Sequence, residues 1–287
     1  MSILKQRLTR QFIIEVFGAR VQPIVQLNYY ILTLIGLCCA TGMTYGETRS
    51  DSPTLQVVGA EFPPYFTDKH KDHGILGLVL RAALSRHGYH LEFKVKPFAR
   101  AVEEVKTGRA DILAATYKTP EREVLFHFSY PIIESEVLLI KHSATDIHYQ
   151  TLEDLVSYRI GKIRRSSSTL NIDQLSNLNI IQVNSYTQGL NMLLLDRIDL
   201  MIFNQLVLKH YLNSPSYSKK RSKLQTLTPA LGKQKTYAAI SKKINNHQAL
   251  SNTLNTTLET LSMNGQLERM IESYLQSAYP ADNDHKN

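Results

Sequence analysis

The order of predicted strands and helices constrains the fold of this chain more than any other feature of its sequence. Alternating apolar residues predict strands at 55–62, 91–98 and 110–115. Apolar residues at helical spacing predict helices at 74–87 and 99–108 between these strands, and a glycine lies at the end of each helix. This β-α-β-α-β order predicts an α/β fold with a mostly parallel sheet covered by helices.

A second unit with the same alternation follows the first. Its short first helix, 151–158, has Thr151 at the N-cap position and acidic residues in the first turn, where they are favourable. A polar stretch at 213–223 predicts a loop or hairpin, and Gly265 interrupts a long amphipathic helical region near the C-terminus. The other predicted elements are strands at 159–163, 179–183, 198–203 and 236–241 and helices at 167–177 and 187–197.

The N-terminus has the features of a secretory signal peptide. A basic leader precedes a short apolar run at 29–43, which ends in small residues. The run is shorter than the roughly 20 residues that a membrane-spanning helix needs. We predict a signal peptide of residues 1–46 cleaved after Gly46, with Gly42 as the alternative site and an uncleaved membrane anchor as the alternative fate. The predicted mature chain is then located in the periplasm.

Catalytic and metal-binding motifs are missing from the sequence. Both cysteines of the chain, Cys38 and Cys39, lie in the leader, so the mature chain has no disulfide, thiolate metal site or cysteine nucleophile. The ten histidines are scattered, and those between residues 70 and 90 have no clear metal-ligand spacing. No HExxH, GxSxG or P-loop motif is present. We therefore expect no metal, no cofactor and no enzymatic activity.

The chain is basic, with 33 Lys and Arg against 25 Asp and Glu and a formal charge of +8. Part of the excess lies in the leader, and the rest is spread along the sequence. The densest basic run, Lys219 to Lys223, is short and lies among serines, which is typical of a solvated loop. We expect no nucleic-acid partner, because a nucleic-acid surface needs a larger basic patch interleaved with aromatic residues.

The carboxyl ends of the predicted strands indicate where a ligand binds. Ligands of open α/β sheets bind beyond these strand ends. Two units that face each other place all the corresponding loops around one cleft. The loops are 61–65, 97–100, 115–122, 164–168 and 203–205.

Short motifs along the chain resemble the family 3 extracellular solute-binding proteins, the amino-acid-binding components of ABC importers. The matching motifs are AEFPPY, GRAD, KTPER, FSYP, LEDL, IGK, DRID and GQLERMIESY, in that order from Ala60 to Tyr274. The resemblance implies the type II periplasmic-binding-protein fold, with two α/β lobes and a ligand cleft between them. Lobe 1 is then 47–141 plus 234–287, and lobe 2 is 142–233, joined by two crossing strands. It also implies a monomer that delivers a small-molecule ligand to an ABC importer permease.

The segment Thr-Pro-Glu-Arg at 119–122 is the strongest candidate for ligand binding. Thr119 is a natural N-cap and Pro120 fits the first helical position. Arg122 lies in the first turn, beside the positive end of the helix, where a cation is favourable only if an anion binds nearby. The resemblance implies that Arg122 binds the carboxylate of a ligand. The alternative is an exposed arginine that pairs with a neighbouring glutamate.

Other polar and aromatic residues fall in the predicted cleft loops, and each has a plain structural alternative. An acid after the first strand could accept a ligand ammonium, tyrosines could sandwich a small molecule, and an arginine after the second strand could be a further anion contact. Hydroxyl groups after the first strand of lobe 2 could close on the ligand, or could only cap a helix. These candidates are Glu61, Tyr65, Tyr117, Arg100, Ser166, Ser167 and Ser168.

One position departs from the family pattern. Amino-acid binders of the family usually carry an aspartate five residues after the last aspartate of the DRID-like motif, and this chain has Asn204 there. Lobe 2 also offers Arg164 and Arg165 where a glycine is common. We therefore predict a polar or anionic ligand, captured by hinge closure, with Asn204 in the site. A ligand-sensing partner of a membrane receptor and a cyclohexadienyl-dehydratase-like enzyme are the alternatives.

Overall fold

The computed structural model describes residues 52–164 and 177–279. The chain divides into two units, residues 1–51 and 52–287, and the described residues all belong to the second. The predicted signal peptide, both cysteines and the serines Ser166, Ser167 and Ser168 lie outside the described residues. Among the described helices, none is both long enough and apolar enough to cross a membrane.

The first group of strands has the parallel order that the sequence predicts. Strand β1 (Thr54–Gly59) lies between β2 (His90–Val95) and β3 (Ile112–Thr116) and pairs in parallel with both. Helix α2 (Gly74–Leu84) connects β1 to β2, and helix α3 (Phe98–Lys106) connects β2 to β3. A short 3-10 helix extends α2 to the predicted end of the helix at His87, where Gly88 has a positive φ of 81°.

The second group of strands repeats this arrangement. Strand β6 (Arg159–Ile163) pairs in parallel with β7 (Asn179–Val183) and with β8 (Leu200–Asn204). Helix α5 (Tyr186–Leu194) connects β7 to β8, and α6 (Gln205–Leu212) follows β8 directly. The predicted helix at 151–158 is shorter than expected, a 3-10 turn at Leu152–Leu155 with Thr151 and Asp154 forming a capping box.

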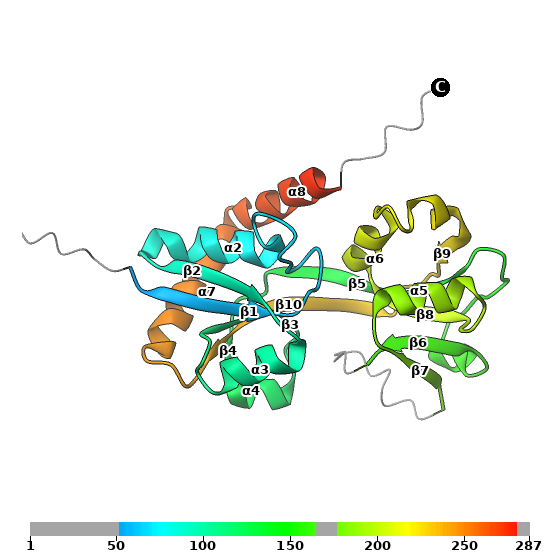
Figure 1. The fold of residues 1–287 in the computed structure, drawn as a ribbon, viewed down its shortest axis with the longest axis horizontal. Coiled ribbons are helices and arrows are strands. Elements are labelled where there is room, and N and C mark those ends of the chain that lie inside the picture. The colour runs from blue at the N-terminus through cyan, green and yellow to red at the C-terminus, as the bar shows by residue number, and fades with distance from the viewer. Residues whose placement is uncertain (1–51, 165–176, 280–287) are drawn as a thin grey trace, which may run out of the picture. The chain divides into compact units, whose positions relative to one another are not determined.

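Two long antiparallel strands connect the groups (Figure 1). Strand β10 (Gly232–Ser241) pairs with β3 on one side and with β5 (Ile133–His142) on the other, and β5 pairs with β8. The sheet order is β2-β1-β3-β10-β5-β8-β6-β7, and the short strands β4 (Phe126–Phe128) and β9 (Leu224–Thr226) pair with β10 and β5. This is the two-lobed α/β architecture that the resemblance implies. We call β5 and β10 the connecting strands.

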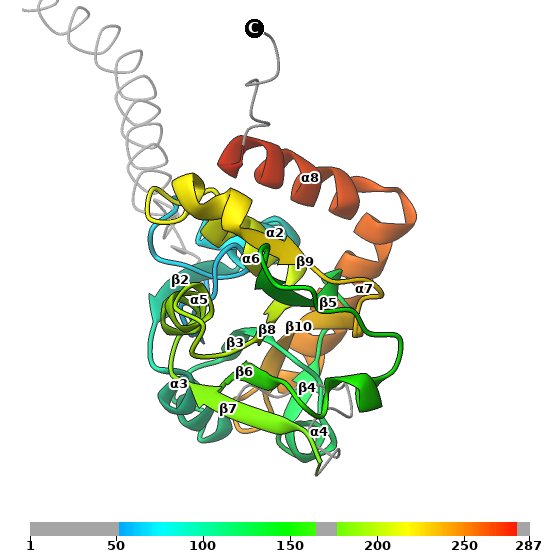
Figure 2. The ribbon, with the colours of Figure 1, turned by 90° about the vertical axis from the view of Figure 1, so that its right-hand side faces the viewer.

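Alternating side chains of the first strand group pack on opposite faces of the sheet. Val57 and Ile112 belong to the core formed with α2 and α7 (His247–Met263), whereas their neighbours Val58 and Leu113 pack with α3. Figure 2 shows the same layers turned by 90°. The remaining helices are α4 (Pro120–Leu125), α8 (Gln266–Ala278) and a 3-10 helix at Ser218–Lys223, inside the predicted polar loop. Gly265, with φ 69°, separates α7 from α8, as predicted.

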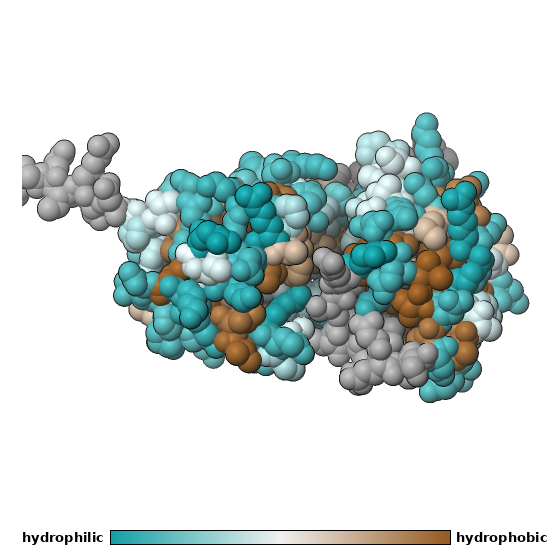
Figure 3. Space-filling model, turned by 60° about the horizontal axis from the view of Figure 1, so that its bottom comes forward, coloured by the Kyte–Doolittle hydropathy of each residue, from teal (hydrophilic) through white to brown (hydrophobic). Residues whose placement is uncertain are grey.

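The outer surface is mainly polar. Figure 3 shows one face, on which hydrophilic surface predominates and the exposed apolar surface is divided into separate patches. Large apolar side chains that are exposed include Val124, Leu195 and Met263. Single exposed apolar side chains of this kind are normal on a soluble domain.

A pair of histidines predicts how stability depends on pH. The Nε2 of His127 in β4 and the Nδ1 of His247 at the start of α7 lie 2.9 Å apart, and the rings stack with centroids 5.0 Å apart. Partial burial, helped by Lys242 and His247, lowers the pKa of His127. The fold thus favours the neutral imidazole. This contribution to stability is present above the unfolded pKa of about 6.5 and is lost as the pH falls below it.

We therefore expect the Tm to decrease between pH 7 and pH 5, and to decrease less in a His127→Gln variant, measured by thermal denaturation across that range. Burial also lowers the pKa of His210, so part of the dependence on pH should remain in the variant. An unchanged slope in His127→Gln would show that the pair contributes nothing to it.

Candidate functional site

The end of β3 carries an irregularity that sets the direction of the following residues. Ala115 has a positive φ of 53°, and the register between β3 and β10 shifts opposite Tyr237 and Ala239. Such a bulge re-aims the side chains that follow it, and a non-glycine residue at positive φ costs about 1–2 kcal/mol. Thr116 and Tyr117 follow directly. The chain thus accepts local strain where the predicted cleft loop begins.

Arg122 is fixed against this irregular strand end. Its Nη1 donates to Thr116 Oγ1 at 3.1 Å and to the carbonyl oxygen of Tyr117 at 3.0 Å, and its guanidinium lies 5.0 Å from the centre of the Phe98 ring. Pro120 occupies the first turn of α4, as predicted. Burial lowers the pKa of Arg122, which means that the surroundings disfavour its cation.

Thr119 and Glu123, which lie on either side of Arg122 in the sequence, have other roles at α4. Thr119 holds the N-cap position with extended backbone, and its carbonyl oxygen accepts from the backbone N–H groups of Arg122 and Glu123, both at 3.0 Å. The side chain of Thr119 does not cap the helix as predicted, since no helix N–H donates to it. Glu123 forms an ion pair with Lys118, with Oε1 and Nζ 2.7 Å apart. Glu123 therefore has a lysine partner, whereas the charge of Glu121 acts on Arg122 and partly offsets the decrease that burial causes in its pKa.

Tyr65, Ser135 and Asn204 form a buried hydrogen-bonded cluster, although they are far apart in the sequence. The Tyr65 hydroxyl donates to Asn204 Oδ1 at 2.8 Å and lies 2.6 Å from Ser135 Oγ. Asn204 Nδ2 donates to Ser135 Oγ at 2.6 Å. Burial raises the pKa of Tyr65 to about 12, so its hydroxyl keeps its proton at any physiological pH. Tyr65 is 0% exposed and presents no free face to a ligand in this structure.

Asn204 has a second structural role as the N-cap of α6. Its Oδ1 accepts from the backbone N–H of Leu206 at 3.0 Å and of Val207 at 3.4 Å. The side chain is 4% exposed, and most of its hydrogen-bonding capacity is used inside the protein. The family pattern predicts Asn204 as a ligand contact, whereas in the structure its amide holds other residues in place.

Aromatic side chains from both strand groups surround this cluster. The Phe62 and Tyr65 rings stack with centroids 4.9 Å apart, and Tyr117 meets Phe62 edge-on at 6.3 Å. Burial, with smaller contributions from Tyr186 and Tyr65, raises the pKa of Tyr117 well above its ordinary value. Tyr186, at the start of α5, packs against Phe203 at 4.7 Å. Tyr117 therefore lies among neutral phenols and is itself partly exposed.

Sequence reasoning missed three of these neighbours. Phe62 lies inside the AEFPPY motif, and Phe98 lies in the predicted loop 97–100, so an aromatic residue at a strand end was a usable signal for both. Ser135 gave no signal, because it lies in a connecting strand that the hydrophobic pattern did not reveal.

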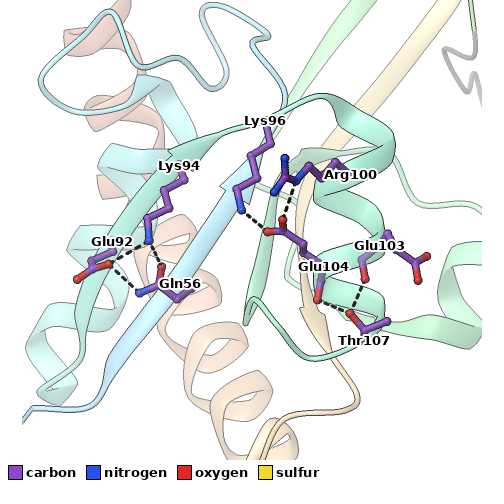
Figure 4. Close-up of polar contacts among 8 residues, drawn as sticks. All are labelled: Gln56, Glu92, Lys94, Lys96, Arg100, Glu103, Glu104 and Thr107. Carbon is purple, nitrogen blue, oxygen red and sulfur yellow. Dashed lines mark hydrogen bonds and ion pairs between the residues drawn. The ribbon is translucent and has the colours of Figure 1, made fainter.

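Glu61 and Arg100 lie outside this cluster. Glu61 is exposed and its Oε1 accepts from Thr67 Oγ1 at 2.7 Å. The negative charge of Glu61 raises the pKa of His210, against the larger decrease that burial causes. Because His210 lies in α6, Glu61 is near this helix. Arg100 is 70% exposed at its side chain, and its Nε lies 3.1 Å from Glu104 Oε1 (Figure 4). Lys96 pairs with the same carboxylate, so an ion-pair network around the largely buried Glu104 accounts for the position of Arg100.

The histidines near the start of the chain have separate partners. His70 lies beside Asp72, His73 stacks on Phe93, and His87 Nε2 lies 3.0 Å from Thr257 Oγ1. In the ranges 52–164 and 177–279, no three or more His, Cys, Asp or Glu side chains gather as a metal site.

The site thus combines a partly buried arginine at the carboxyl end of β3 with aromatic side chains from both strand groups. The chain belongs to the bacterial extracellular solute-binding proteins, family 3, whose family model matches residues 56–277. A comparison with curated proteins gives no match.

Solved structures with the same fold include amino-acid-binding proteins. AbpA from Streptococcus pneumoniae, an amino-acid ABC transporter substrate-binding protein bound to L-arginine, has 22% identity and a TM-score of 0.64, over 80% of this chain and 98% of that one. The GluR0 ligand-binding core in complex with L-glutamate has 17% identity and a TM-score of 0.67, over 78% and 99%. A mutant of ArgBP from T. maritima has 18% identity and a TM-score of 0.64, over 78% and 95%. At these identities the similarity concerns the fold.

Proposed function

We propose that this protein captures a small polar or anionic solute in the periplasm and presents it to an ABC importer. The observation that carries the proposal is the guanidinium of Arg122, fixed at the carboxyl end of β3 by Thr116 and Tyr117 and partly removed from water. A cation in such surroundings gains more from an anion than a solvated cation does. A carboxylate of the solute is the group that this site fits best.

The proposed mechanism is closure of two lobes around the solute. Lobe 1 is 47–141 plus 234–287 and lobe 2 is 142–233, so that the boundaries fall within the connecting strands β5 and β10. Arg122 and the partly exposed Tyr117 of lobe 1 bind the solute first. Ser166, Ser167 and Ser168 then close on it from lobe 2, and the solute shifts the population towards the closed form. The permease recognises that closed form.

The polarity of the site favours a carboxylate without an adjacent ammonium group. Asn204, at the end of β8, carries an amide that is already hydrogen-bonded to Tyr65 and Ser135. Glu61, the acid that we predict to face a solute, is exposed to water, which weakens the attraction between its charge and an ammonium group. An amino acid would therefore lack a well-placed partner for its α-ammonium.

A ligand screen tests this proposal directly. Thermal-shift and native mass-spectrometry measurements on the purified protein would compare monocarboxylates, dicarboxylates, amino acids and oligopeptides at physiological salt. We expect a carboxylate without an α-ammonium to raise the Tm and to remain bound in the mass spectrum. Sub-micromolar calorimetric binding of an ordinary zwitterionic amino acid would contradict the proposed solute class.

Ligand sensing through a membrane partner is the second candidate function. The fold similarity to the GluR0 ligand-binding core, with a TM-score of 0.67, is the observation that favours it. Solute uptake by cells that lack the gene separates the two candidates, because transport requires this protein for uptake and sensing does not.

A further inference from the structure

The cluster of Tyr65, Ser135 and Asn204 is a closed ring of hydrogen bonds. The Tyr65 hydroxyl donates to Asn204 Oδ1, and Asn204 Nδ2 donates to Ser135 Oγ. The Ser135 hydroxyl is therefore left to donate to the Tyr65 oxygen, 2.6 Å away. Within the ring, each of the three side chains thus donates one bond and accepts one bond. Closed networks of this kind in a dry environment are stronger than isolated hydrogen bonds.

The ring joins parts of the molecule that belong to different strand groups. Tyr65 lies in the loop after β1, Ser135 in the connecting strand β5, and Asn204 at the end of β8. The three residues are 0%, 5% and 4% exposed. Water is therefore not available to replace a broken bond, and a rotation of one group against the other that separates Tyr65 from Asn204 leaves buried polar atoms unpaired.

Two members of the ring, Tyr65 and Asn204, are each hydrogen-bonded to the start of a helix. The carbonyl oxygen of Tyr65 accepts from the backbone N–H of Leu76, in the first turn of α2, at 2.9 Å. Asn204 caps α6 through Leu206 and Val207. A shift of α2 or α6 therefore moves one member of the ring. The ring thus responds to the angle between the two strand groups rather than to the motion of a flexible loop.

The neighbouring strand β10 offers the ring a second partner. Gln234 pairs directly opposite Ser135, so that their side chains share one face of the connecting strands. Gln234 is 4% exposed, and its Nε2 has no hydrogen-bond partner among the described residues. Buried donors without partners are rare in native structures. When Tyr65 and Asn204 separate, Gln234 can bond Ser135 in their place.

We infer that this ring, the lobe-linking ring, is a two-state positioning device at the hinge. With Tyr65 and Asn204 joined, it holds the two strand groups in the arrangement seen here. With Ser135 bonded to Gln234, it permits a more open arrangement. Tyr65, Ser135 and Asn204 then act as positioning residues that set how much of the ligand-free protein is ready to bind. The inference rests on the proposed hinge closure and adds the residues that control it.

The test measures the distance between the lobes in ligand-free protein. The Cys38→Ser and Cys39→Ser substitutions remove the native cysteines of the full chain, and Met263→Cys and Leu195→Cys then place one spin label on each lobe, at side chains that are 78% and 62% exposed. Pulsed electron paramagnetic resonance gives the distance distribution. We expect Tyr65→Phe to move this distribution by several ångströms or to broaden it clearly, because it removes the bond to Asn204 and leaves Ser135 free to bond Gln234. We expect Gln234→Leu to narrow it, because the open arrangement loses its partner.

Tyr217→Phe is the matched control. Tyr217 is 3% exposed, and its hydroxyl bonds the Thr187 carbonyl oxygen and Asn191 Oδ1, both at 3.1 Å and both in α5. This variant should lower the Tm by an amount comparable to Tyr65→Phe without moving the distance distribution. The inference is wrong if Tyr65→Phe keeps the parent distribution, or if Gln234→Leu leaves it unchanged or broadens it.

This test separates the ring from the proposed function. The distances between the spin labels are measured in ligand-free protein. They therefore test the ring even if no carboxylate binds in the ligand screen. An unchanged distribution in Tyr65→Phe rejects the ring even when a carboxylate binds the parent protein.

Discussion

Replacing Arg122 with alanine should weaken binding of the carboxylate ligand by roughly tenfold or more, the loss of one charge-assisted contact. The Tm of the ligand-free protein should remain nearly unchanged. The bonds that Arg122 makes to Thr116 and Tyr117 are lost, but so is the cost of keeping a guanidinium away from water. Titration calorimetry with the carboxylate from the ligand screen measures the affinity, and thermal denaturation measures the stability.

Two further variants show whether geometry or charge matters. Arg122→Lys keeps the charge but lacks the planar fork that binds a carboxylate with two hydrogen bonds, so it should recover only part of the affinity. Arg109→Ala removes an exposed arginine that follows α3 and should leave the affinity unchanged. Equal affinities for the parent and Arg122→Ala would remove Arg122 from the site.

Replacing Gly74 with alanine should destabilise the fold by about 3 kcal/mol or more. Gly74 has a φ of 81°, and a Cβ at this position would lie 2.6 Å from the carbonyl oxygen of Tyr65 and 2.8 Å from that of Pro64. Neither backbone atom can move easily, because these oxygens accept from the N–H groups of Leu76 and Ile75 at 2.9 and 3.0 Å. Denaturant unfolding measures the free energy of unfolding.

Gly88→Ala is the matched comparison for this effect. Gly88 has the same φ of 81°, but a Cβ at this position would have no neighbouring atom within 4 Å. Only the left-handed backbone is unfavourable there, so the loss should be about 1–2 kcal/mol. A loss of similar size in the two variants would show that the close approach of α2 to the loop at Pro64 and Tyr65 does not matter.

The pattern of the sequence predicted most strands and helices because their causes are local. Val57, Ile112 and Ile160 lie in strands identified from short apolar runs, and Gly265 separates two helices as its position indicated. Strand β5 was missed because residues 137–141 are buried in succession, so the run lacks the alternation of a half-buried strand. Only the family resemblance implied crossing strands.

The candidate site was predicted less completely than the fold. The position of Arg122 follows from the Thr-Pro-Glu-Arg segment, and Pro120 in the first turn confirms the predicted start of α4. The sequence did not reveal the bulge at Ala115, because a register shift depends on the partner strand β10. It predicted Tyr65 and Asn204 as ligand contacts, but could not show that their side chains bond each other.

The sequence by itself determined the α/β alternation, the ends of the helices at their glycines and the family, because each depends on residues close together in the chain or on motif order. Tertiary structure alone decided which polar atoms meet. Tyr65 and Asn204 are separated by 139 positions, yet their side chains lie within 2.8 Å. A bond of this kind exists only after two strand groups have packed around a shared pair of connecting strands. Local patterns carry no information about that geometry.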